Sequence, residues 1–226
     1  MNTMTEYEIK ISNKHILIND GNVWLLVDTG GNRSFCETKQ ITLCGERFSV
    51  PTYVQFYTRV DTEYVSNNVG EHVSGLIGID ILSRFAIKFD LPAGKLTFGC
   101  PTDGLTPVPP GAGRGFVSMN MAINGHKAHV LLDSGAPISY VSPFLTEGLQ
   151  SIGTAIDFSP LTPNSPFETP IFEFPATFAG NAFTMNAGHL PEELERAVTG
   201  LGFDGAVGFE VLSRFPLVIA DGSVWV

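Results

Sequence analysis

Short runs of alternating polar and apolar residues, separated by turn-forming residues, cover much of the chain. Residues Tyr7 to Ile18 alternate in polarity, pass through Asn19-Asp20-Gly21 and lead into an apolar run from Trp24 to Val27. The stretch from Phe116 to Leu132 repeats this order around Asn124-Gly125. Because Asp-Gly or Asn-Gly between two such runs is a strong signal for a β-hairpin, the pattern predicts a mainly β fold.

Helical patterns are confined to short segments. Residues Pro191 to Thr199 begin with proline and acidic residues and are followed by Gly200, as expected for a helix. Apolar residues also fall at helical spacing just after Gly78 and just after Gly208. A helical turn is therefore predicted at each of these two places.

Each half of the chain carries an apolar run that ends in an acid, a hydroxyl residue and a glycine. The two motifs are Asp28-Thr29-Gly30 and Asp133-Ser134-Gly135. A single motif of this kind usually marks an ordinary turn. Here a second repeat follows in the same order, since Gly75-Leu-Ile-Gly78 and Gly205-Ala-Val-Gly208 both lead to Leu-Ser-Arg-Phe. Two ordered pairs indicate an internal duplication that builds one site from two halves.

The stretch that joins the halves is rich in proline and glycine, which favours an exposed, extended connection. We therefore predict an N-terminal lobe over residues 1–104, a linker over 105–115 and a C-terminal lobe over 116–226. The two lobes are expected to be pseudo-symmetric copies.

The second half is about 30 residues longer than the first between its acid and a hairpin pattern that the halves share. Within this insertion, two strand-like segments flank the sequence Pro160-Leu161-Thr162-Pro163-Asn164-Ser165-Pro166. We interpret this stretch as a substrate-binding flap, because a hairpin that projects over a site acts as a lid. An irregular surface loop is the alternative. The first half is expected to lack a flap, unless residues 40–52 form a short one.

Composition and charge narrow the classes of function. Hydrophobic residues make up 43% of the chain and charged residues 16%, as in a globular protein, and no apolar run reaches the ~18 residues of a membrane span. The net charge of −10 argues against nucleic acid or an anionic membrane as a partner. No secretory leader pattern is visible, so the expected location is cytoplasmic.

Two facing carboxyl groups share one proton, because two negative charges at short range repel each other. The ionised group then takes a proton from water, while the protonated group donates to a carbonyl oxygen. Such a pair suits hydrolysis of an amide without a covalent intermediate. Gly30 and Gly135 allow backbone N–H groups to approach the carboxylates, and Thr29 and Ser134 offer hydroxyl groups that would tie the two loops together.

Asp28-Thr29-Gly30-Gly31 and Asp133-Ser134-Gly135-Ala136 resemble the two active-site motifs of a retropepsin-like or pepsin-like aspartic protease. The resemblance covers nearly the whole chain, whose size is similar to two retropepsin-type subunits fused in tandem. It implies a bilobal fold of two β-barrel lobes with a cleft between them, Asp28 and Asp133 as the catalytic pair, and an extended peptide or protein substrate. It also implies that no cofactor or metal is needed.

Gly31 departs from this pattern, since Ser or Ala is usual at its position. The leading hypothesis is an aspartic endopeptidase that acts as a monomer, because both half-sites lie on one chain. The alternative is a catalytically silent peptide-binding module that keeps the cleft. A third hypothesis, a structural β protein whose two acids bind a cation, has few oxygen ligands. Four aromatic residues are candidate walls of a substrate pocket, although such residues more often belong to the core: Phe35, Phe56, Phe158 and Phe167.

Overall fold

The computed structural model describes residues 4–21, 23–109, 115–162 and 165–226. Strands dominate it, in two large sheets and two small hairpins. In chain order the strands are β1 (Thr5–Ser12), β2 (His15–Asn19), β3 (Trp24–Val27), β4 (Phe35–Cys36), β5 (Gln40–Leu43), β6 (Glu46–Ser49), β7 (Tyr53–Gln55), β8 (Arg59–Asp61), β9 (Gly75–Ile77), β10 (Ile87–Asp90), β11 (Lys95–Phe98), β12 (Ser118–Ile123), β13 (His126–Leu132), β14 (Ser139–Val141), β15 (Gly153–Asp157), β16 (Phe167–Phe178), β17 (Asn181–Gly188), β18 (Gly205–Val207), β19 (Leu217–Ala220) and β20 (Ser223–Trp225). The helices are α1 (Thr62–Val69), α2 (Ile79–Leu82), α3 (Glu192–Gly200) and α4 (Phe209–Leu212), with a 3-10 turn η1 (Pro143–Thr146). The prediction of a mainly β fold is confirmed.

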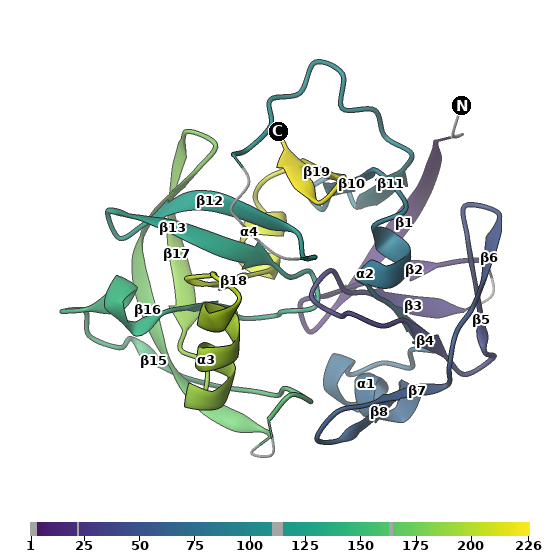
Figure 1. Cartoon of the computed structure of the whole chain (residues 1–226), viewed down its shortest axis with the longest axis horizontal. Coiled ribbons are helices and arrows are strands. Elements are labelled where there is room, and N and C mark those ends of the chain that lie inside the picture. Colours follow the sequence, from purple (N-terminus) through teal and green to yellow (C-terminus); the bar gives the residue numbers. More distant parts are fainter. Residues whose placement is uncertain (1–3, 22, 110–114, 163–164) are drawn as a thin grey trace.

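The larger sheet has nine strands in the order β20-β19-β10-β11-β1-β2-β3-β9-β4 (Figure 1). Strand β19 pairs antiparallel with β10, so that Ile219 lies opposite Ile87. The last two strands of the chain therefore extend a sheet that is otherwise built from the first half.

The second large sheet has the order β12-β13-β18-β14-β17-β16-β15. Strand β12 also pairs with β16, where Ala122 lies opposite Thr177. This extra pairing closes six strands into a barrel and leaves β15 outside it. Figure 1 shows these strands together on the left, away from β1 to β9.

The predicted hairpin around Asn124-Gly125 is confirmed, since β12 and β13 pair on either side of it. The stretch from Tyr7 to Ile18, however, is not the single strand that its alternation suggested. Asn13 and Lys14 both have positive φ angles, of 45° and 63°, so the chain reverses there and β1 pairs with β2. Asn tolerates this left-handed conformation better than most residues, which favours a turn at that point.

The predicted helices are also present, as α2, α3 and α4. Helix α1 was not predicted, although its ends carry recognisable signals. The Asp61 carboxylate accepts the Tyr64 N–H at 3.1 Å, and Gly70 ends the helix with a φ of 82°. Both are standard capping arrangements. Among the described residues, no helix is long and apolar enough to cross a membrane.

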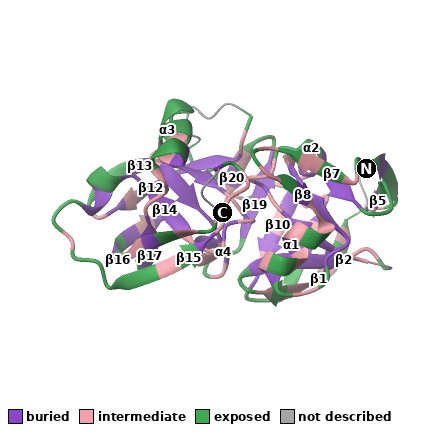
Figure 2. Cartoon of the chain, turned by 90° about the horizontal axis from the view of Figure 1, so that it is seen from below, coloured by how far each residue is buried: buried purple, intermediate pink, exposed green. Residues whose placement is uncertain are grey.

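The main buried cluster draws on both halves of the chain and includes Val27, Ile77, Leu132 and Val207. Figure 2 shows the buried segments concentrated along the strands of both sheets. The stretch predicted to be an exposed linker, residues 105–115, is partly buried near its start. Val108 is buried there, and its N–H donates to the carbonyl oxygen of Val224 at 2.8 Å.

Candidate active site

Each of the two motif acids lies directly after a strand that runs parallel to a repeated glycine segment. Asp28 follows β3, and its N–H donates to the Ile77 carbonyl oxygen at 3.0 Å. Asp133 follows β13, and its N–H donates to the Val207 carbonyl oxygen at 2.9 Å. The two sequence repeats thus form matching local structures, each of which presents an acid at the end of a buried strand.

Thr29 and Ser134 join the two motifs through reciprocal hydrogen bonds. The Thr29 N–H donates to the Ser134 hydroxyl at 3.0 Å, and the Ser134 N–H donates to the Thr29 hydroxyl at 2.9 Å. Each hydroxyl also donates across to the other motif's strand, to the carbonyl oxygens of Leu132 and Val27 at 2.7 and 2.8 Å. Both residues are completely buried, so this network fixes the two acids relative to each other.

The glycines of the motifs lie against the acids of the opposite half. A Cβ atom on Gly135 would lie 2.6 Å from the Asp28 carboxyl carbon, and one on Gly30 would collide with the Asp133 carboxyl group. Only residues without a side chain allow this approach. The two carboxyl groups consequently lie next to each other, close enough for the charge of Asp28 to act on Asp133.

The two carboxyl groups accept different numbers of hydrogen bonds from backbone N–H groups. The carboxylate of Asp28 accepts the Gly30 N–H at 3.0 Å and the Gly31 N–H at 2.7 Å, whereas that of Asp133 accepts the Gly135 N–H at 2.9 Å. Burial raises the pKa of Asp28, and these N–H groups oppose the rise. Burial and the adjacent charge of Asp28 raise the pKa of Asp133 well above its usual range. The pair therefore favours a proton on Asp133 and a charge on Asp28.

A cavity of about 320 Å³ lies over the two acids and has mainly apolar walls. All four aromatic residues predicted as candidate walls of a substrate pocket line this cavity, and Phe35 also belongs to a buried apolar cluster. Helix α3, whose position over the site was not predicted, contributes an apolar face. The lining residues include Phe35, Phe56, Leu76, Leu131, Phe158, Phe167, Leu194, Ala197 and Val198.

The hairpin of β15 and β16 reaches this cavity with its tip. Pro160 and Leu161 line the cavity, while Thr162 is buried and its hydroxyl donates to Glu193 of α3 at 3.2 Å. The Ser165 hydroxyl accepts the Ser159 N–H at 3.0 Å, which closes the tip on itself. Pro166 is exposed and is not among the residues that line the cavity, and Pro163 and Asn164 lie outside the described residues.

The first half also contributes a hairpin to the cavity, although no flap was expected in this half. Strands β7 and β8 pair antiparallel, and Val54, Phe56 and Val60 from this hairpin line the cavity. The hairpin on residues 40–52, formed by β5 and β6, precedes it in the chain. Strands of three residues are too short to produce a clear alternating pattern, which explains why this hairpin was not predicted.

Sequence reasoning also missed a buried pair in the cavity wall. The Tyr140 hydroxyl donates to the Asp157 carboxylate, whose other oxygen accepts the Phe158 N–H at 2.8 Å. Burial raises the pKa of Asp157 and of Tyr140. This pair connects the barrel to the start of the hairpin tip, and no short motif links the two residues in the sequence.

No protein-family model matches the sequence, and neither does any of the curated proteins compared. Among solved structures, the chain is similar to the aspartic proteinase from Irpex lacteus, with a TM-score of 0.54 and 13% sequence identity. The similarity covers 99% of this chain and 96% of that proteinase. This chain has an aspartic-proteinase-like fold.

Within this aspartic-proteinase-like fold, the described residues contain no group of three or more His, Cys, Asp or Glu side chains placed to hold a metal ion. The acids that the motifs single out, Asp28 and Asp133, lie together at the floor of the apolar cavity. The site brings two carboxyl groups together with their backbone donors and an apolar lining.

Proposed function

We propose that this chain is an aspartic endopeptidase of the retropepsin-like or pepsin-like kind, in which Asp28 and Asp133 activate a water molecule. The observation that carries the proposal is the crossed arrangement of the two motifs, where each glycine packs on the opposite acid, so that the two carboxyl groups lie next to each other. A hydrolase that uses one charged and one protonated carboxyl group needs this proximity.

In this mechanism Asp28 acts as the base and Asp133 as the acid. The N–H groups of Gly30 and Gly31 stabilise the charge on Asp28, which takes a proton from water between the two groups. As the water oxygen bonds to the carbonyl carbon of the peptide, Asp133 donates its proton to the carbonyl oxygen. The C–N bond then breaks as Asp28 passes its proton to the nitrogen and Asp133 takes back a hydroxyl proton, which leaves a carboxylic acid, an amine and the starting acid pair. The apolar cavity lowers the local dielectric constant and strengthens both interactions. Thr29 and Ser134 hold the two loops in register.

The proposal includes the finer architecture. Two lobes related by a pseudo-twofold axis, residues 1–104 and most of 116–226, enclose an extended peptide, with β19 and β20 joined to the sheet of the first lobe. The tip of the β15–β16 hairpin covers the peptide as a flap. A single chain carries both acids, so a monomer is sufficient for activity. Turnover per chain is then independent of protein concentration, and a steep fall on dilution contradicts the monomer.

The test is digestion of a diverse peptide mixture from pH 3 to pH 8, with the wild-type chain, Asp28→Asn and Asp133→Asn in parallel. We expect cleavage by the wild type alone, with both variants folded, because either substitution removes one partner of the acid–base pair. Circular dichroism checks folding. Undiminished cleavage by either variant contradicts the mechanism. If the wild type cleaves no peptide at any pH but still binds peptides, the chain is instead the catalytically silent peptide-binding module.

A further inference from the structure

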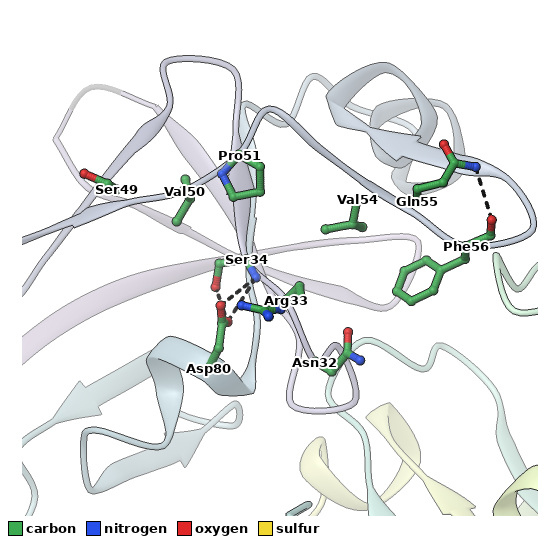
Figure 3. A pocket seen from close by; sticks show the side chains of 10 residues that line it. All are labelled: Asn32, Arg33, Ser34, Ser49, Val50, Pro51, Val54, Gln55, Phe56 and Asp80. Carbon is green, nitrogen blue, oxygen red and sulfur yellow. Dashed lines mark hydrogen bonds between the residues drawn. The ribbon is translucent and has the colours of Figure 1, made fainter.

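A second cavity, of about 330 Å³, adjoins the one over the two acids. Asn32, Arg33, Val54 and Phe56 line both cavities, so the second continues the first alongside the loop that carries Asp28. Figure 3 shows this second cavity from close by. A peptide extended over the two acids would reach it with a side chain some residues away from the cleaved bond. The remaining lining residues are Ser34, Ser49, Val50, Pro51, Gln55 and Asp80.

Arg33 is the one basic side chain among the described residues that line the two cavities. It is exposed, and it forms no ion pair with any residue in the described part of the chain. In a chain with a net charge of −10, seven of the described basic residues have an acidic partner, whereas Lys14, Lys39, Arg47 and Lys127, like Arg33, form no ion pair among the described residues. The paired residues are Lys10, Arg59, Arg84, Lys88, Lys95, Arg196 and Arg214.

Asp80 lines the same cavity, but its carboxylate serves the active-site loop. Oδ1 accepts the Ser34 hydroxyl at 2.6 Å, and both oxygens accept the Ser34 N–H, at 3.0 and 3.2 Å (Figure 3). The Ser34 hydroxyl in turn accepts the N–H of Gly78 at 2.9 Å. Asp80 is thus engaged in tying this loop to the repeated glycine segment, and the guanidinium group of Arg33 remains free for a ligand.

The lining of the second cavity matches an acidic side chain. A guanidinium group binds a carboxylate through two parallel hydrogen bonds, and Asn32, another exposed residue that lines both cavities, carries an amide donor. Val50, Pro51 and Val54 provide an apolar wall for the methylene groups of a glutamate. An apolar substrate side chain would leave Arg33 without a partner.

We propose that this second cavity is a subsite for an acidic side chain of the peptide substrate, and that Arg33 is the residue that determines this specificity. The inference rests on the proposed peptidase function, because the ligand is taken to be a peptide held across Asp28 and Asp133. It adds a charge preference that the apolar cavity over the acids does not supply.

The test uses one cleaved peptide as the parent, with Glu, Gln or Lys placed in turn at each of the four positions on either side of the cut bond. At one position, we expect the wild type to prefer Glu over Gln about three- to tenfold in kcat/KM, as for a partly solvated charge pair. Arg33→Gln abolishes this preference, and Arg33→Glu reverses it in favour of Lys. The preference weakens as salt concentration rises.

Arg47→Gln is the matched control, because Arg47 is also exposed but lines neither cavity, and it should keep the preference. Binding of the same peptides with the cut bond reduced to a CH₂–NH group separates this inference from the proposed function. If the peptides bind with a preference for Glu over Gln that depends on Arg33, but none of them is cleaved, the subsite stands and the peptidase function is wrong. Cleavage with equal rates for Glu and Gln at every position retains the peptidase and overturns the subsite.

Discussion

The ring of Phe158 stacks on the ring of His15, with centroids 6.2 Å apart and an angle of 28° between the planes. Phe158 belongs to the tip of the β15–β16 hairpin in the second half of the chain, and His15 begins β2 in the first. Tyr64 of α1 meets the same phenylalanine edge-on, at 5.9 Å. The hairpin tip, which lines the same cavity as the two acids, is therefore held by the opposite half of the molecule, in addition to Tyr140 on its own side.

Replacing Phe158 by alanine removes both ring contacts and releases the tip from the first half. We expect KM for peptides to rise several-fold, with a smaller change in kcat, because the tip covers the cavity and does not touch the reacting atoms. Steady-state kinetics measures both constants. Phe144→Ala is the control, since Phe144 also lies edge-on to a histidine, His126, away from the cavity. A change in kcat alone would contradict a covering role.

Replacing Ser134 by alanine leaves the Thr29 N–H and the Val27 carbonyl oxygen without their partners in a buried position. We expect a loss of about 1–3 kcal/mol in the free energy of unfolding, measured by urea denaturation. Thr29→Val has a similar cost, and the double variant loses less than the sum because the two residues share one network. Ser151→Ala, at an exposed hydroxyl, is the control. Additive losses would show that the two hydroxyl groups act independently.

Gly31→Ala brings the first motif to the same Gly-Ala ending as the second, yet we expect it to impair the site. A Cβ atom on Gly31 would lie 2.7 Å from an oxygen of Asp28. Displacing that carboxylate lowers kcat/KM by roughly 10–100-fold. Ala136, at the matching position, makes a different contact, because its N–H donates to the backbone oxygen of Asp133 at 3.2 Å. Ala136→Gly should therefore change kcat/KM little, and equal effects of the two substitutions would refute this explanation.

The raised pKa of Asp133 makes the stability of the chain depend on pH with a definite sign. Below the ordinary carboxyl pKa of 3.8, Asp133 is protonated in both folded and unfolded chains. As the pH rises above that value, the unfolded chain loses this proton while the folded chain retains it, so stability falls until the raised pKa is passed. Asp133→Asn cannot ionise and avoids this loss.

We therefore expect the Tm of Asp133→Asn, relative to wild type, to rise between pH 3 and pH 7 in thermal melts followed by circular dichroism. Asp103→Asn, at an exposed position, serves as the control for removal of one carboxyl group. A difference that stays constant across this range, or falls, would contradict the protonated state assigned to Asp133.

Signals from residues that are neighbours in the sequence were sufficient to predict much of the fold and the two acids at the centre of the site. Asn124-Gly125 marked a hairpin because its turn needs residues that tolerate positive φ, and both have it, at 48° and 80°. The repeated acid-hydroxyl-glycine motif identified Asp28 and Asp133, because an internal duplication can be recognised from the sequence alone. The capping residues of α1 can also be recognised in the sequence, although this helix was not predicted.

The rest depends on contacts between segments that are far apart in the chain. No local pattern indicates that β19 pairs with β10, that Tyr140 holds Asp157, or that Phe158 rests on His15. Whether Arg33 has an ionic partner depends on where every acid of the folded chain lies. The sequence by itself determined the mainly β character, the hairpin turn at Asn124-Gly125 and the two acids, because these follow from neighbouring residues. Only the tertiary structure decided what surrounds the acids, because packing and electrostatics act between residues that the chain brings together when it folds.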